Sequence, residues 1–180
     1  MSLKLLGLSG SLRSNSFNRK LVQEAGRIWG EDYFDTHSLN LPLYDGDLEE
    51  SSGIPLAVTE LAHSISDANA VVISTPEYNQ SISGVLKNAL DWVSRVEGAP
   101  WRDKPVAIMS AAAGRAGGAR AQYALRLCLT PFRPRLLPGP EVMVAAAAKE
   151  FDDQGLLKGE LYVKLLTELM AELREAASRK

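Results

Sequence analysis

Two runs of almost unbroken apolar residues constrain the fold of this chain more than any other feature. They read AVVIST at residues 70–75 and PVAIMS at residues 105–110. A strand with one face in water alternates apolar and polar residues, whereas a strand that is covered on both faces is apolar throughout. The two runs therefore predict buried strands of a parallel sheet with helices on both sides.

Strands and helices are expected to alternate along the rest of the chain. Further strands are predicted at residues 3–6 and 33–38, with a fifth strand split into 135–137 and 142–144 by a Pro-Gly-Pro sequence. Apolar residues at helical spacing predict helices at 18–30, 54–67, 83–96, 118–129 and 160–177, and a loop at 39–52. Five β-α units indicate a three-layer α/β fold whose five-stranded parallel sheet has the order 2-1-3-4-5.

The composition narrows the class of protein further. The chain has 180 residues, 46% hydrophobic and 23% charged, which predicts one domain over residues 1–180. Twenty basic and 22 acidic residues give a net charge of −2, so no basic excess predicts a nucleic-acid partner. The single cysteine, Cys128, excludes an internal disulfide and favours a reducing compartment. Without a leader sequence, or an apolar run near the ~18 residues of a membrane span, we expect a cytoplasmic protein without a membrane partner.

A loop rich in hydroxyl groups follows the first predicted strand. Residues 7–18 read GLSGSLRSNSFN and lead into a predicted helix, whose first turn carries unpaired N–H groups and a positive dipole end. Ser11, Ser16 and Asn18 can add donors, and Arg13 can add a forked, charge-assisted contact. Each residue alone is explained equally well as a turn former or helix cap. The combination predicts a phosphate-binding loop, although the patterns GxxxxGK[ST] and GxGxxG are both absent, which disfavours a P-loop NTPase and a dinucleotide-binding Rossmann domain.

Two more loops are expected at the same edge of the sheet, where doubly wound folds bind their ligands. In residues 76–83, Tyr78 offers a flat face, and Asn79 and Gln80 carry amides that can pair with a polar ring edge. Turn formation and capping of the next helix explain this loop equally well. Residues 111–117 are mostly small, which lets a planar ligand lie against the backbone.

Catalytic side chains are missing from these loops. His37 and His63 are the only histidines, neither lies in a Cys/His/Asp cluster, and no GxSxG sequence is present. We therefore expect neither a metal site nor a Ser-His-Asp triad. Phosphate donors, a ring platform and amides without an acid, base or nucleophile are typical of a protein whose cofactor carries the chemistry.

The loops resemble those of the NADPH-dependent FMN reductase family, flavodoxin-like proteins that include quinone, chromate and azo-dye reductases. The matching segments lie within residues 3–145 and read GSLRxxSFN from Gly10, TPEYN from Thr75, GxLKNAxDW from Gly84 and GGxRxQ from Gly117. The resemblance implies a flavodoxin-like fold that binds FMN and uses NADPH or NADH.

The resemblance also implies roles for individual residues. The residues implied to hold the FMN phosphate are Ser11, Arg13, Ser16, Phe17 and Asn18. Those implied to border the flavin ring are Pro76, Glu77, Tyr78 and Asn79, with Ser110 and Gly114 at its other edge. The loop sequences add Ser9 and Gln80 to this candidate cofactor-binding set.

The resemblance implies an FMN-dependent oxidoreductase. Hydride would pass from NAD(P)H through bound FMN to a small acceptor such as a quinone, free flavin, azo compound or chromate, by alternating half-reactions. Two other functions stay open. A flavodoxin-type electron carrier is one, although such carriers tend to be strongly acidic and this chain is not. A non-enzymatic, nucleotide-binding regulatory module is the other.

The predicted helix at 83–96 carries two apolar stripes. Leu86 and Leu90 lie on one stripe and Trp92 on the other. A surface helix covers the sheet with one stripe, so the second is expected to be exposed and to form the interface of a homodimer or homotetramer. Covering of this stripe by residues 98–104 is the alternative. The resemblance likewise implies dimers or tetramers, the latter with Arg120 and Glu141 pairing between subunits.

Overall fold

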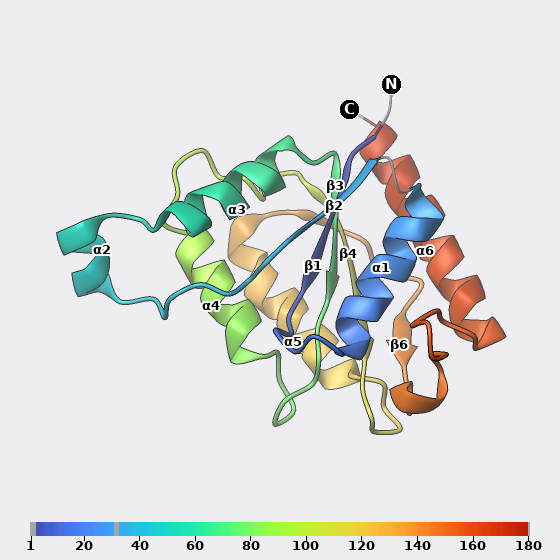
Figure 1. The fold of residues 1–180 in the computed structure, drawn as a ribbon. Coiled ribbons are helices and arrows are strands. Elements are labelled where there is room, and N and C mark those ends of the chain that lie inside the picture. Colours follow the sequence, from blue (N-terminus) through green and yellow to red (C-terminus); the bar gives the residue numbers. More distant parts are fainter. Residues whose placement is uncertain (1–2, 31–32, 180) are drawn as a thin grey trace.

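The computed structural model describes residues 3–30 and 33–179, and its centre is a parallel β-sheet. The sheet order is β2-β1-β3-β4-β5, as the sequence predicted (Figure 1). The bounds of these strands are Leu5–Ser9 for β1, Phe34–His37 for β2, Ala70–Ser74 for β3, Pro105–Ala111 for β4 and Arg135–Leu136 for β5. The first strand begins at Leu5 instead of residue 3.

The predicted split strand is confirmed. Both β5 and β6 (Val142–Val144) pair in parallel with β4. β5 pairs with Pro105 and Val106 at the beginning of β4, and β6 pairs with residues 109–111 at its end. The interruption between them contains the cis peptide bond Gly139-Pro140.

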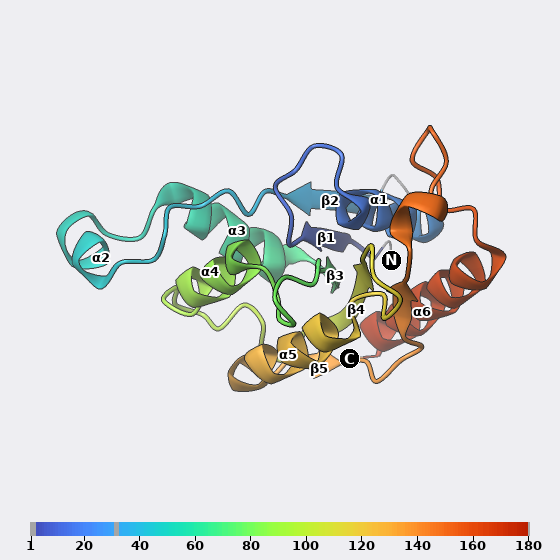
Figure 2. The same ribbon diagram turned by 90° about the horizontal axis from the view of Figure 1, so that it is seen from below.

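Two layers of helices cover the sheet (Figures 1 and 2). Helices α1 (Phe17–Trp29) and α6 (Glu160–Ser178) pack on one face. Helices α3 (Leu56–Asp67), α4 (Gly84–Val93) and α5 (Ala119–Leu129) pack on the other. Alternate residues of each inner strand supply the two cores, so that Val72 lies in the core with α1 whereas Ile73 lies in the core with α4. This alternation of two apolar sets explains why the inner strands read as unbroken apolar runs.

The predicted loop at 39–52 contains a helix, α2 (Gly46–Ser52), which the sequence did not predict. Asp45 caps it by accepting a hydrogen bond from the backbone N–H of Asp47. No residue of α2 is buried, so the helix has no apolar face that periodicity could detect. Residues 39–55, here called the arm, project beside α3 and α4 (Figure 2).

The prediction that α4 exposes its second apolar stripe is wrong, because the arm covers this stripe. The side chain of Trp92 is fully buried, its Nε1–H donates to the carbonyl of Pro42 at 2.8 Å, and its ring meets the Tyr44 ring edge-on. Asn88, one turn earlier on α4, accepts from Tyr44 N at 2.8 Å and donates to the same Pro42 carbonyl at 2.9 Å. This stripe of α4 therefore cannot form the predicted interface between subunits.

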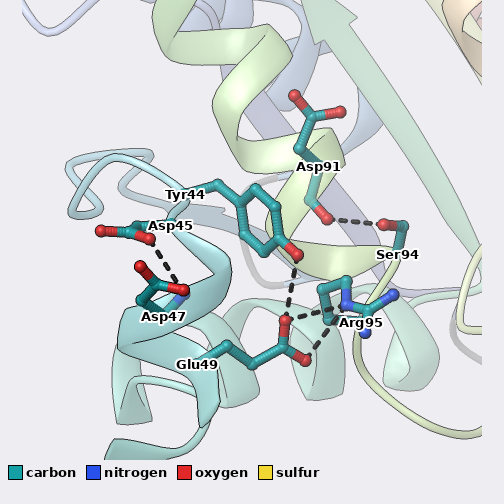
Figure 3. A network of polar contacts seen from close by, with 7 residues as sticks. All are labelled: Tyr44, Asp45, Asp47, Glu49, Asp91, Ser94 and Arg95. Carbon is teal, nitrogen blue, oxygen red and sulfur yellow. Dashed lines mark hydrogen bonds and ion pairs between the residues drawn. The ribbon is translucent and has the colours of Figure 1, made fainter. Parts of the chain in front are cut away.

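A polar network fixes α2 to the end of α4 (Figure 3). The carboxylate of Glu49 accepts from the Tyr44 hydroxyl at 3.1 Å and pairs with Arg95 at 2.9 Å. The hydrogen bond to Glu49 raises the pKa of the Tyr44 phenol above its ordinary value. The phenol therefore keeps its proton at the ordinary pKa of tyrosine, and the contact is lost only as the pH rises through this raised pKa.

Candidate functional site

Three serine hydroxyls in the loop between β1 and α1 form a cradle of donors. Ser9 Oγ accepts from Ser11 N at 3.3 Å, Ser11 Oγ accepts from Arg13 N at 3.4 Å, and Ser16 Oγ accepts from Asn18 N at 3.2 Å. In the part of the chain that the structure describes, none of these three hydroxyls donates its own proton. Each serine thus shapes the loop through its oxygen and keeps an O–H group for a ligand.

The cradle opens into a cavity of about 270 Å³. Ser11, Arg13 and Ser16 line it together with residues of the two neighbouring loops. Arg13 is exposed and forms no ion pair within residues 3–30 and 33–179. A free guanidinium, free hydroxyls and a helix N-terminus on one cavity match a phosphate monoester, which presents several anionic oxygens.

Asn18 holds the site together from below. Its buried side-chain oxygen accepts from Ser74 Oγ at 2.8 Å and from Ala111 N at 2.9 Å, and its Nδ2 donates to the Ala111 carbonyl at 2.9 Å. One amide therefore joins the beginning of α1 to the ends of β3 and β4. Phe17, beside it, stacks on Phe151 with ring centroids 5.5 Å apart.

The loop after β3 is a tight hairpin. Tyr78 and Ser81 exchange two backbone hydrogen bonds of 3.0 Å, with Asn79 and Gln80 at the tip. Both tip residues have positive φ, 50° and 65°, as a two-residue hairpin of this kind requires. The tip side chains and the Tyr78 ring are exposed, whereas Pro76 is buried at the start of the loop.

Glu77 ties the loop after β3 to the beginning of α5, the helix that follows the loop after β4. Its carboxylate accepts from the backbone N–H of Arg120 at 3.1 Å and pairs with the Arg120 guanidinium at 3.4 Å. The carboxylate of Glu77 lies beside the first turn of α5, where it is favourable because it faces the positive end of the helix dipole. Arg120 therefore has a partner inside its own chain, in addition to any contact with Glu141 between subunits.

The loop after β4 exposes backbone where a flat group can lie. Gly114 is exposed, and open space surrounds the position of a side chain there. Ser110 differs, because it is buried, donates to the Gly117 carbonyl at 2.6 Å and accepts from Gln122 Nε2 at 2.8 Å. Both hydrogen bonds of its hydroxyl are made within the protein. Ser110 therefore affects the cavity only by holding the shape of the loop.

Ser74, Ser83 and Gln122 were missed as site residues. Ser83 caps α4 by accepting from Leu86 N, so capping of the next helix, one of the two explanations of this loop, is confirmed for Ser83. Its hydroxyl also donates to the Gly10 carbonyl at 2.6 Å. The only sequence signal for Ser74 is a hydroxyl that interrupts an apolar strand. Their partners lie up to 73 residues away in the chain, so no local pattern could identify the contacts.

Among the described residues, no three His, Cys, Asp or Glu side chains gather as a metal site would require, and no helix is long and apolar enough to cross a membrane.

Comparisons with known proteins show what this chain is similar to. Residues 3–149 match the model of the family described as NADPH-dependent FMN reductase. The chain is 42% identical over 174 residues to an NAD(P)H-dependent FMN reductase of Pseudomonas aeruginosa, covering 96% of this chain and 94% of that protein. It is 39% identical over 156 residues to a quinone reductase of Escherichia coli, covering 84% and 82%. Among solved structures, the flavoenzyme NAD(P)H:(acceptor) oxidoreductase of Paracoccus denitrificans superposes with a TM-score of 0.87 at 29% identity, covering 98% of each chain.

Proposed function

The chain belongs to the NADPH-dependent FMN reductase family, and we propose that it passes hydride from NAD(P)H through bound FMN to a small acceptor. Quinones are the acceptor class that we propose first, because relatives at 35–39% identity are named quinone reductases or quinone oxidoreductases. Free flavin, azo compounds and chromate belong to the same proposal. FMN supplies two-electron chemistry on its ring, so the protein needs no nucleophile of its own.

The donor set fits FMN. The hydroxyls of Ser11 and Ser16 and the guanidinium of Arg13 would hold the terminal phosphate, since these groups line one cavity and have donors free within the described chain. Ser9 does not line this cavity, and it would support the cradle by accepting from Ser11 N. Asn18 would act on that phosphate by fixing the cradle, because its oxygen is already used in two hydrogen bonds.

The ring would lie between the hairpin after β3 and the backbone of residues 112–114. Pro76 and Tyr78 would border one part of the ring, and Glu77 would hold the two loops at a fixed separation through Arg120. The backbone N–H groups of Asn79 and Gly114 donate to nothing in the described chain. Fixed donors of this kind stabilise negative charge on a ring edge, as an oxyanion hole does.

The free hydroxyl cradle beside an exposed backbone slot is the observation that carries this proposal. Its test is the initial rate of NADPH oxidation at several fixed concentrations of a benzoquinone. If nicotinamide and quinone use one open face of the ring in turn, the double-reciprocal plots should be parallel. Intersecting lines, with a ternary complex supported by product inhibition, would contradict the claim that both substrates use one face of the ring in turn. They would not contradict the reductase activity itself.

We also propose that the protein is a homo-oligomer, at least a dimer. The arm carries Leu43, which is 82% exposed, and ends beside Leu56, which is 73% exposed. Large apolar side chains on a projecting segment suit burial against a second copy. A two-fold interface would place the arms of both subunits in equivalent contacts.

A further inference from the structure

A second cavity lies on the other side of the loop that forms the hydroxyl cradle. Its volume is about 500 Å³, and it is bounded by the ends of β1 and β2 and by the side of α1. Ser11 is the one residue that lines both this cavity and the one beside Arg13. Apart from Ser9 and Ser11, which belong to the cradle, none of its lining residues has a part in the proposed binding of FMN.

The polar groups around this cavity carry positive charge or none. Arg19 of α1 is exposed and has no ion pair or hydrogen-bond partner from its side chain in residues 3–30 and 33–179. His37 donates from its Nδ1 to the carbonyl of Ser38 at 3.0 Å, and its Nε2 has no partner in the described chain. Gln23 and Thr36 add an amide and a hydroxyl, and no carboxylate is among the lining residues. These groups suit a phosphorylated, polar ligand.

The place of the cavity in the fold indicates which phosphate group it would bind. The chain lacks the Rossmann fingerprint, but it shares with Rossmann domains a second strand that lies beside the first. In those domains the end of the second strand faces the adenosine ribose; a carboxylate there accepts from the 2′-hydroxyl of NAD, and a nearby arginine accommodates the 2′-phosphate of NADP. Here β2 ends in Thr36 and His37, with Arg19 across the cavity. The one acidic residue of β2, Asp35, lies within ion-pair distance of Lys4 at 3.9 Å and does not line the cavity.

Adjacent residues of one loop line the two cavities, so a single extended ligand can occupy both. The consecutive residues Leu12 and Arg13 line different cavities, Leu12 the second and Arg13 the first. Building on the proposed function, we propose that the second cavity binds the ribose 2′-phosphate of NADPH, with Arg19 as its main cationic contact. The nicotinamide would then reach the first cavity over the crest of this loop. Arg19 is thereby the residue that favours NADPH over NADH.

The direct test is the binding of adenosine 2′,5′-bisphosphate to the FMN-loaded protein by titration calorimetry, with 5′-AMP and inorganic phosphate as comparison ligands. The bisphosphate should bind more tightly than either, and Arg19→Ala should weaken it about tenfold or more, because one charge-assisted contact is lost. Lys164→Ala removes an exposed positive charge on α6 that has no partner in the described chain, so it serves as the matched control and should leave this affinity unchanged. FMN affinity should be unchanged in both variants.

A kinetic comparison separates a specific contact from a general effect of charge. Arg19→Ala should raise the KM for NADPH by the same factor as the loss of bisphosphate affinity, while the KM for NADH and both kcat values stay unchanged. Equal loss for both nicotinamides, or bisphosphate binding that Arg19→Ala does not change, would overturn the assignment. Absence of NADPH oxidation in the wild-type protein would instead contradict the proposed function, and the calorimetric result would still decide the phosphate site.

Discussion

At the scale of single residues, the site depends on a few polar side chains that each make several contacts. The amide of Asn18 makes three buried hydrogen bonds, to Ser74 and to both backbone groups of Ala111. Buried amides that satisfy three backbone and side-chain groups are costly to replace, because every abandoned partner loses its hydrogen bond in a region without water. The cradle therefore has a fixed shape before any ligand binds.

Arg13 provides the clearest residue-level prediction. Arg13→Ala should weaken FMN binding by about 1.5–3 kcal/mol, or about 10–150-fold, because the only guanidinium among the hydroxyl donors of the cradle is removed. The dissociation constant can be measured by titrating FMN into the flavin-free protein and following flavin fluorescence. Arg13→Lys keeps the charge without the fork and should show an intermediate loss. An unchanged affinity in Arg13→Ala would exclude its contact with the phosphate.

The sequence predicted which loops carry the candidate site residues, but not which contacts each side chain makes within the protein. Ser11, Ser16 and Arg13 lie on one cavity, as their spacing before a helix indicated. Asn18 and Ser110 were predicted for the same site, and in the structure their side chains also hold loops together. The partners of Asn18 lie in β3 and β4, and those of Ser110 lie in the next loop and in α5. The distinction between a donor to ligand and a donor to backbone therefore requires the folded chain.

At the scale of elements, the arm is the segment that the sequence described least well. The alternation of strands and helices was predictable because buried faces leave periodic apolar residues. Helix α2 buries none of its residues and depends on a cap and on the contacts of Glu49 with Tyr44 and Arg95. The covering of Trp92 by Pro42, 50 residues earlier, likewise left no local signal.

The contacts of Asn88 predict how firmly the arm is held. Asn88→Leu keeps the side-chain size but removes the hydrogen bonds to Pro42 and Tyr44. Their loss should cost about 1–2 kcal/mol locally and raise the population of detached arm about 5–30-fold. Limited proteolysis with a glutamate-specific protease, which cuts after Glu49 and Glu50, should speed up by the same factor when opening is fast relative to cleavage.

Lys87→Ala is the matched control for the arm. Lys87 lies on the same helix, but its ammonium pairs with Asp91 at the exposed surface and does not contact the arm. Its proteolysis rate should equal that of the wild type. If Asn88→Leu is cut no faster than this control, the hydrogen bonds to Asn88 do not hold the arm in place.

At the scale of the whole molecule, the assembly follows from what the arm exposes. Light scattering at micromolar protein should give at least twice the monomer mass of 19.5 kDa, about 39 kDa. Leu43→Glu should shift the mass toward the monomer, because a charge in an apolar interface is costly unless it is paired. Leu43 is suitable for this test because it is exposed in the monomer, whereas Leu90 of α4 is only 2% exposed and its substitution would disturb the core.

Leu127→Glu is the control for the assembly. Leu127 is 75% exposed on α5, outside the arm, and its substitution should leave the mass unchanged. A monomer mass for the wild-type protein would contradict the proposed oligomer. A mass that falls in Leu127→Glu but not in Leu43→Glu would move the interface from the arm to α5.

The central claim is that bound FMN is reduced by a nicotinamide and reoxidised by a small acceptor at this site. The most direct measurement is the absorption spectrum of the FMN-loaded protein under anaerobic rapid mixing. We predict that NADPH alone bleaches the flavin absorbance, and that a benzoquinone, mixed in afterwards, restores it without further NADPH. A protein that retains no FMN, or whose flavin absorbance NADPH does not change, would contradict the claim.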